Sequence, residues 1–212
     1  MLKEKLQSKE ARLGVIGLGY VGLPLSMEFA RAGFRVVGID NDAEKVRKLG
    51  EGESYIQDVP SERVREALDA GKFEATTDYS VLETLDAVDI CVPTPLRKTK
   101  DPDISYVRSA VVEIVKYLHP QMLVILDSTT YPGTTDEVIL SRLEATGLQV
   151  GEDFYLAFSP ERVDPGNEEW TTRNIPKVVG GVTPECTEHA ALLYSQTLGP
   201  CLLYTSPSPR DP

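Results

Sequence analysis

The sequence has little of what metal centres and disulfide frameworks need. Its 212 residues include only three cysteines, Cys91, Cys186 and Cys201, and two histidines. The cysteines are widely separated and form no C-x-x-C pair, so the usual spacings of a zinc site or a disulfide framework are missing. We therefore predict no metal, and the odd, sparse count of thiols indicates a reducing compartment.

Long apolar runs and an excess of positive charge are also missing. No stretch approaches the ~18 apolar residues of a membrane span, and residues 1–11, rich in Lys and Glu, lack the apolar run of a signal peptide. We therefore expect no membrane partner and a cytoplasmic location. With 33 acidic and 22 basic residues the formal net charge is −11, which disfavours nucleic acid as a partner. An anionic ligand would need helix N-termini and a few Lys or Arg side chains.

What the sequence does contain is a glycine turn between a strand and a helix. The apolar run 13–16 predicts a strand buried on both faces, and helical character follows until Gly33. Between them Gly17, Gly19 and Gly22 have the spacing G-x-G-x-x-G. Gly17 permits a tight turn, Gly19 leaves the backbone open to a pyrophosphate, and Gly22 lets the helix pack closely on the strand. The positive end of the helix then faces the phosphates.

The context of this turn favours a dinucleotide ligand. The next predicted strand, 34–39, ends in Asp40, 18 residues after Gly22 and near the ~20 expected for a carboxylate that binds the adenine ribose. Lys45, five residues further on, is within reach of the same adenosine end, although a solvated surface lysine is the alternative. For the whole motif, the alternative is a glycine-rich turn in another kind of α/β protein.

The rest of the chain alternates strands with helices. Further strands are predicted at 73–76, 86–92, 122–126, 154–158 and 175–179. This order predicts an α/β fold, a Rossmann-like doubly wound and mainly parallel sheet with helices on both faces. We expect Ser61 to cap one helix, and Thr134 or Thr135 to cap another that runs to about residue 145.

Polar residues follow the predicted strands at the points where they end. They are Asp40, Thr94, Thr129 and Glu161. Because ligands of such sheets bind beyond the carboxyl ends of the strands, we expect one cleft to hold all four. Cys91, inside a predicted strand, is expected to be a core residue rather than a nucleophile.

Four segments resemble a known family. They are GLGYVGLP at 17–24, CVPTP at 91–95, DSTTYPGTT at 127–135 and SPER at 159–162. Together they are similar to the nucleotide-sugar dehydrogenases, the UDP-glucose/GDP-mannose dehydrogenase family. Residues 159–167 and 175–181 look most like the branch that acts on UDP-N-acetylhexosamines. The resemblance covers residues 1 to about 200, and the four motifs together are far more specific than the glycine turn alone.

This resemblance implies NAD as cofactor and a UDP-sugar as substrate. Such enzymes oxidise the C6 alcohol of the sugar to a carboxylate with two NAD⁺. A cysteine captures the aldehyde as a thiohemiacetal, a second hydride transfer gives a thioester, and water hydrolyses it. The resemblance also implies a homodimer for the full-length enzyme.

Matching motifs assign roles at the cofactor. The turn residues Gly17, Gly19, Tyr20, Val21 and Gly22 are expected to bind it, with the Val21 amide on the pyrophosphate. Asp40 and Lys45 would hold the adenosine end. Thr94 and Thr129 would line the nicotinamide side.

A second group of residues is expected at the reaction. Glu161 would activate or orient the water, and Thr129 is its expected catalytic companion. Arg162 and Lys177 would lie near the sugar or the pyrophosphate. Each has a plainer alternative. Thr129 could only tie its turn together, Glu161 could satisfy loop N–H groups, and Arg162 and Lys177 could be solvated.

The resemblance ends near residue 200. The family continues with a central helix that carries a lysine and an asparagine, and with a second α/β domain that holds the nucleophilic cysteine. Neither is present, and Cys201 has no such setting. Residues 201–212, with three prolines in the last six positions, do not continue the family pattern and resemble a translated adapter or cloning scar.

The sequence therefore predicts three parts. They are a polar, solvated lead-in helix at 1–11, an NAD-binding domain at 12–200, and a non-native-looking, disordered tail at 201–212. We expect this chain to be the cofactor domain of a larger dehydrogenase and to be inactive alone. Two alternatives are a stand-alone NAD-binding or regulatory module without catalysis, and the cofactor domain of a β-hydroxyacid dehydrogenase. The SPER and Pro-Thr-Pro segments argue against the latter.

Overall fold

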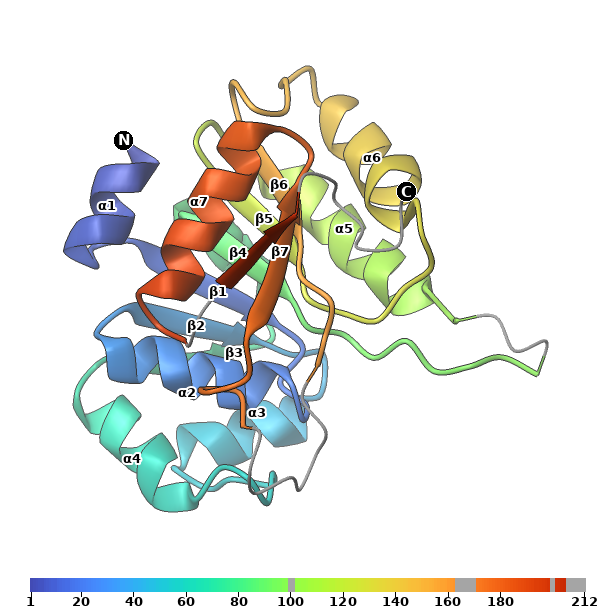
Figure 1. The fold of residues 1–212 in the computed structure, drawn as a ribbon. Coiled ribbons are helices and arrows are strands. Elements are labelled where there is room, and N and C mark those ends of the chain that lie inside the picture. Colours follow the sequence, from blue (N-terminus) through green and yellow to red (C-terminus); the bar gives the residue numbers. More distant parts are fainter. Residues whose placement is uncertain (99–101, 163–170, 199–200, 205–212) are drawn as a thin grey trace.

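The computed structural model describes residues 1–98, 102–162, 171–198 and 201–204. The described strands form one sheet in the order β3-β2-β1-β4-β5-β6-β7-β8, with helices on both faces (Figure 1). The strands are β1 Arg12–Ile16, β2 Arg35–Ile39, β3 Phe73–Thr76, β4 Ala87–Ile90, β5 Leu123–Leu126, β6 Tyr155–Phe158, β7 Lys177–Gly181 and β8 Cys201–Tyr204. Neighbours are parallel except β6 and β7. The predicted doubly wound, mainly parallel fold is confirmed.

The helices divide between the two faces of the sheet. They are α1 Leu2–Ser8, α2 Gly22–Ala32, α3 Ala43–Gly50, α4 Ser61–Asp69, α5 Ser105–Tyr117, α6 Ser141–Glu144 and α7 Pro184–Ser195, with a 3₁₀ segment η1 at Tyr79–Thr84 and a π-helical segment η2 at Thr134–Leu140. One core contains buried residues of α1, α2, α3, α4 and α7, and the other contains those of η1, α5, η2 and α6. Each helix thus buries its apolar stripe against the sheet.

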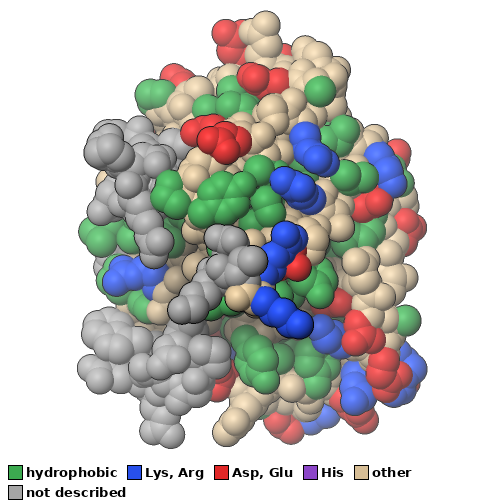
Figure 2. Space-filling view, turned by 90° about the vertical axis from the view of Figure 1, so that its right-hand side faces the viewer, with side chains coloured by type: hydrophobic (Ala, Val, Ile, Leu, Met, Phe, Trp, Pro, Cys, Tyr) green, Lys and Arg blue, Asp and Glu red, His purple; other side chains and the backbone are tan. Residues whose placement is uncertain are grey.

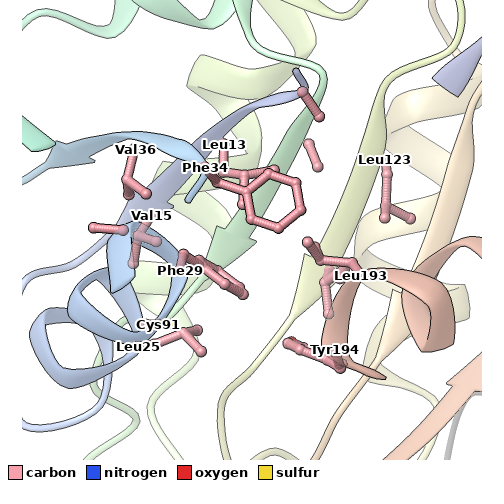
Figure 3. Close-up of a cluster of buried hydrophobic side chains, with 14 of the residues drawn as sticks. Leu13, Val15, Leu25, Phe29, Phe34, Val36, Cys91, Leu123, Leu193 and Tyr194 are labelled. Carbon is pink, nitrogen blue, oxygen red and sulfur yellow. The ribbon is translucent and has the colours of Figure 1, made fainter. Parts of the chain in front are cut away.

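Strand β1 touches both cores, as its apolar run predicts. Leu13 and Val15 belong to one core, together with Phe29 of α2 (Figure 3), whereas Ile16 belongs to the other. Side chains alternate between the faces of a sheet, so a strand covered on both sides must be apolar throughout.

The order of the strands reverses between β1 and β4. Strand β1 pairs with β2 on one side and with β4 on the other, and the amide of Cys91, just after β4, donates to the carbonyl of Ile16 at 2.8 Å. The carboxyl ends of β1 and β4 therefore lie side by side at the position where doubly wound sheets bind ligands.

The helix caps predicted at Ser61 and at Thr134 or Thr135 are wrong. The N-cap of α4 is Pro60, and the Ser61 hydroxyl instead accepts from the amide of Ser54 at 2.9 Å. The segment after β5 begins at Gly133, a left-handed residue, and runs as π-helical turns before the short α6, which ends at Glu144. The hydroxyl of Thr134 donates back to the carbonyl of Tyr131 at 2.8 Å, so it serves the preceding turn rather than the helix.

The expected solvated helix at the start of the chain is also corrected. Helix α1 buries Leu2 and Leu6 in the core beside α7, and Lys3 forms an ion pair with Glu188 of α7. The high content of Lys and Glu concealed an apolar pair at i and i+4, which lies on one face of a helix.

The far edge of the sheet differs from the prediction in two ways. The predicted strand 175–179 ended before the glycines at 180–181, whereas β7 includes both. A Cβ at Gly181 would collide with the amide of Thr187 in α7, so the close packing of this helix on β7 needs glycine there. Residues 201–204, expected to be disordered, form β8 beside β7. The prolines begin only at residue 207, so nothing in 201–204 prevents pairing with the free edge of β7. The rest of the predicted tail, 205–212, lies outside the described residues.

Candidate functional site

A cleft of about 510 Å³ opens at the carboxyl ends of the central strands. Nine of the predicted site residues line it: Gly17, Gly19, Tyr20, Val21, Asp40, Lys45, Thr94, Thr129 and Glu161. The structure therefore brings together the four strand-end residues in one cleft, as predicted. Gly22 and Arg162 are not among the residues that line it.

The three glycines of the turn have three different local environments. Gly17 has φ of +93°, which favours glycine, and a Cβ there would lie 2.6 Å from the carbonyl oxygen of Cys91. A Cβ at Gly22 would collide with the carbonyl oxygen of Gly17, so the close approach of helix to strand needs glycine. A Cβ at Gly19 would meet nothing within 4 Å. This open space above the backbone is what a pyrophosphate requires.

The start of α2 faces the same cleft. Val21 is the N-cap of this eleven-residue helix, and Tyr20 beside it is 60% exposed. The first N–H groups of a helix have no acceptor inside the helix, and the helix dipole makes this end positive. The turn is thus suited to bind an anion.

One end of the cleft is organised by Asp40. Its Oδ2 accepts from the Leu18 amide at 2.8 Å and from Lys45 Nζ at 3.5 Å, and its Oδ1 accepts from the Asp42 amide at 3.0 Å. An ionised carboxylate offers about four acceptor positions. The contacts among the described residues use three, which leaves Oδ1 able to accept from a ribose hydroxyl.

Lys45 is held at this end rather than being freely solvated. Besides its contact with Asp40, its Nζ lies 5.8 Å from the ring centroid of Tyr55. The Tyr55 hydroxyl donates to the carbonyl of Leu18 at 2.7 Å. Burial, with Asp40 and Asp42 nearby, raises the pKa of Tyr55, so its hydroxyl remains a donor. The side chains around Asp40 therefore also fix the glycine turn.

The turns after β4 and β5 are tied together in the middle of the cleft. The Thr94 hydroxyl donates to the carbonyl of Thr129 at 2.6 Å, and the Ser128 hydroxyl donates to the carbonyl of Val92 at 2.9 Å. The Thr94 proton is thus committed to the protein, while its oxygen can still accept. Cys91 lies beneath, 6% exposed, and burial raises the pKa of its thiol, as suits a core residue rather than a nucleophile.

Glu161 lies at the end of the cleft remote from Asp40 along the sheet order. Its Oε1 accepts from the Arg162 amide at 2.7 Å, and its Oε2 is 4.0 Å from Lys177 Nζ. The Lys177 side chain is only 2% exposed and contacts Asp127 Oδ2 at 2.6 Å, so the solvated alternative for Lys177 is wrong. The Arg162 guanidinium donates to the carbonyl of Pro176 at 3.0 Å. Its assignment to the sugar stays a prediction.

A buried polar cluster behind Glu161 was missed by the sequence analysis. The Tyr194 hydroxyl donates to Asp89 Oδ1 at 2.7 Å and lies 3.3 Å from Asp127 Oδ2. Burial, and then the charge of Asp127, raise the pKa of Asp89 to about 8. Burial alone would lower the pKa of Lys177, but Asp127 and Glu161 raise it, so its ammonium group stays charged. One signal was available: Asp89 and Lys177 stand within apolar runs, where a charged residue needs a partner.

The surface charge is not spread evenly. Figure 2 shows Lys and Arg side chains gathered down the middle of one face, with most acidic side chains toward its edges. Positive side chains are therefore locally concentrated on a chain whose net charge is −11. Within the described ranges, no group of three or more His, Cys, Asp or Glu side chains could hold a metal ion. Of the helices in those ranges, none combines the length and apolar character needed to cross a membrane.

Comparison with known proteins identifies the family of this chain. Residues 11–198 match the UDP-glucose/GDP-mannose dehydrogenase family, NAD binding domain. The chain belongs to this family. The family and the NAD cofactor predicted from the motifs are thereby confirmed, and the open backbone at Gly19 and the acceptor on Asp40 fit that cofactor.

The relatives of this chain are named as nucleotide-sugar dehydrogenases. The chain is 37% identical over 184 residues to the UDP-N-acetyl-D-mannosamine dehydrogenase of Pyrococcus horikoshii, covering 86% of this chain and 44% of that protein. It is 36% identical over 191 residues to the UDP-N-acetyl-D-glucosamine 6-dehydrogenase of Pseudomonas aeruginosa, covering 90% and 44%. The NDP-N-acetyl-D-galactosaminuronic acid dehydrogenase of Methanosarcina mazei Go1 superposes with a TM-score of 0.85 at 38% identity, covering 95% of this chain and 46% of that one. This chain thus spans less than half the length of these relatives.

Proposed function

We propose that this chain is the cofactor domain of an enzyme that oxidises the C6 alcohol of a UDP-N-acetylhexosamine to a carboxylate. The observation that carries the proposal is that Asp40, the glycine turn and Glu161 line one cleft. The activities in the names of its relatives support the substrate class. The homodimer and the cytoplasmic location stay predictions.

At the cofactor, each residue has a physical task. NAD supplies a hydride acceptor when it is bound. The amides at the start of α2, with Val21 among them, would bind the pyrophosphate, and Asp40 would accept from the adenine ribose. A 2′-phosphate would be repelled by Asp40, so we expect NAD rather than NADP. Thr94 and Thr129 would line the nicotinamide side.

Glu161 would act in the last step, the hydrolysis of a thioester on a cysteine outside this chain. Its carboxylate takes a proton from water as the water oxygen bonds to the thioester carbon. The C–S bond then breaks, the thiolate leaves, and the proton passes to it. The chain alone would bind NAD without carrying the oxidation through to the carboxylate, because the cysteine that forms the thioester would lie outside it.

The test uses the full-length protein that carries this domain. UDP-N-acetylglucosamine, UDP-N-acetylmannosamine and UDP-glucose are offered with NAD, and NADH absorbance is followed. Glu161→Gln should leave NAD affinity unchanged and slow turnover by about 100-fold or more, and a covalent sugar adduct should accumulate in the intact mass. Glu62→Gln, an exposed carboxylate on α4, is the matched control. Oxidation of none of the sugars would refute the function, and unchanged turnover in Glu161→Gln would refute the role of that residue.

A further inference from the structure

We infer that Lys177 is a positioning residue, whose ammonium group, held by Asp127, fixes the carboxylate of Glu161 at the cleft. The inference rests on the proposed function only for the step in which Glu161 acts. Its structural part concerns three side chains of this domain and can be tested without any reaction.

Strand pairing explains why Lys177 meets Glu161. In the antiparallel pair β6–β7, Ala157 lies opposite Gly181 and Phe158 opposite Gly180. Continued beyond the end of β6, the same register places Lys177 opposite Glu161. The Arg162 guanidinium, which donates to the carbonyl of Pro176 at 3.0 Å, ties the two segments together at this point. The antiparallel pairing of β6 with β7 thus brings the segment of Glu161 alongside Lys177.

Both carboxylate oxygens of Glu161 have a defined neighbour. Oε1 accepts from the Arg162 amide at 2.7 Å, and Oε2 is 4.0 Å from Lys177 Nζ. An ammonium group has three donors, of which one contacts Asp127 Oδ2 at 2.6 Å. The cation is thus anchored on its buried side by Asp127 and presented to Glu161 on its cleft side.

The anchor itself is held from behind. Tyr194 of α7 places its hydroxyl 3.3 Å from Asp127 Oδ2 and its ring centroid 5.5 Å from Lys177 Nζ. The side chains of Lys177 and Asp127 are 2% and 0% exposed. A charge that packing confines in this way can hold its neighbour in one geometry, as positioned catalytic groups require.

Stability alone gives no reason for this pair. Burying an ammonium and a carboxylate has a desolvation cost that can exceed their attraction, and well-packed apolar residues are often as stable. The pair lies beside a cleft residue, and Asp127 itself lines the cleft. What a lysine provides here, and an apolar residue does not, is a fixed positive charge next to Glu161.

The first part of the test is structural and uses this chain. The double variant Asp127→Asn/Lys177→Met removes both charges of the buried pair, so that no lone charge is left buried. Its crystal structure should show the Glu161 carboxylate displaced from its native position with β7 unchanged. Asp89→Asn, in the same buried cluster but away from the cleft lining, is the control and should leave Glu161 in place. An unmoved Glu161 in the double variant would overturn the inference.

The second part uses the full-length protein and separates the steps of the reaction. At saturating NAD, the double variant should give a first burst of NADH close to the native one, because the burst precedes hydrolysis. Thioester hydrolysis should slow by on the order of 10- to 100-fold, with a covalent sugar adduct accumulating in the intact mass. A purely structural role would instead lower the burst and the thermal stability together, or give the same loss in Asp89→Asn, and either result would overturn the inference. If the native protein oxidises no UDP-sugar, the proposed function fails, while the crystal structures still decide whether Lys177 positions Glu161.

Discussion

The two ends of the cleft are built in different ways. At the Asp40 end, the partners are close in sequence: Leu18, Asp42 and Lys45 are within 22 residues of Asp40, and the Lys45 side chain is 36% exposed. At the Glu161 end, Lys177 pairs with Asp127 across 50 positions, and both are buried. Exposed pairs contribute little because water and salt screen them, whereas removing one partner of a buried pair leaves an uncompensated charge. The two ends should therefore respond very differently to the same substitution.

The largest effect is expected from removing one buried charge. Lys177→Met should lower the free energy of unfolding by about 3–5 kcal/mol, because Asp127 is left buried without its cation. The same change at the other end, Lys45→Met, should cost below ~1 kcal/mol. Urea denaturation of the two variants measures the loss in the free energy of unfolding at each end of the cleft. Adding Asp127→Asn to Lys177→Met should recover most of the loss, and equal losses at the two lysines would break the comparison.

The next effect is a dependence of the folding stability on pH, which arises from Asp89 in the buried cluster behind Glu161. The pKa of Asp89 is about 8 in the folded chain, against 3.8 as its ordinary value. Between these values the unfolded chain binds fewer protons, so this group stabilises the fold fully below pH ~4 and its contribution is lost as pH rises toward ~8. The slope is about 1.4 kcal/mol per pH unit at most.

The check is a comparison of unfolding free energies at several pH values. Asp89→Asn removes the titration, so its stability relative to the native chain should rise by about 2 kcal/mol from pH 6 to pH 8. Parallel pH curves for the two proteins would show that Asp89 is not protonated in the fold.

Two glycines of the turn should separate an effect on packing from an effect on NAD binding. Gly22→Ala should lower the free energy of unfolding by about 1–3 kcal/mol, because its methyl group would collide with the Gly17 carbonyl. Gly19→Ala should leave the free energy of unfolding nearly unchanged, since a Cβ at this position meets nothing within 4 Å. The same substitution should weaken NAD binding, because the methyl group would occupy the space that the pyrophosphate needs. Thermal unfolding with and without NAD distinguishes these cases. A loss of stability in Gly19→Ala equal to that in Gly22→Ala would contradict the two roles.

The smallest effect is expected at the exposed end and concerns binding. Asp40→Ala should weaken NAD binding by ~1–3 kcal/mol, the scale of a hydrogen bond to a charged group, as measured by calorimetric titration. Asp40→Asn keeps an acceptor oxygen but loses the charge. The difference between its affinities for NAD and for NADP should therefore be smaller than in the native chain. Tighter binding of NADP than of NAD by the native chain would contradict the assignment of Asp40.

The sequence predictions were accurate where contacts are local in sequence, as at the Asp40 end, and failed where they join distant segments, as at the Glu161 end. The strand, glycine turn and Asp40 depend on local spacing, so the sequence predicts them, and strand-end logic places Thr94, Thr129 and Glu161 in one cleft. The caps at Ser61 and Thr134 failed because turn residues can bond backward as well as forward, and only the fold selects the partner. Helix α1 was expected to be solvated, because its charges are apparent in the sequence but its partner α7, more than 170 positions away, is not.

The sequence by itself determined the fold class, the family and the anion-binding turn. Apolar periodicity and glycine spacing act over a few residues, where backbone sterics leave few conformations open. Tertiary structure alone decided that β7 runs antiparallel to β6, that Lys177 thereby lies beside Glu161, and that Asp89, Asp127 and Tyr194 share one buried cluster. These contacts join strands and a helix from distant parts of the chain. Their energies depend on burial, which only the packed sheet creates.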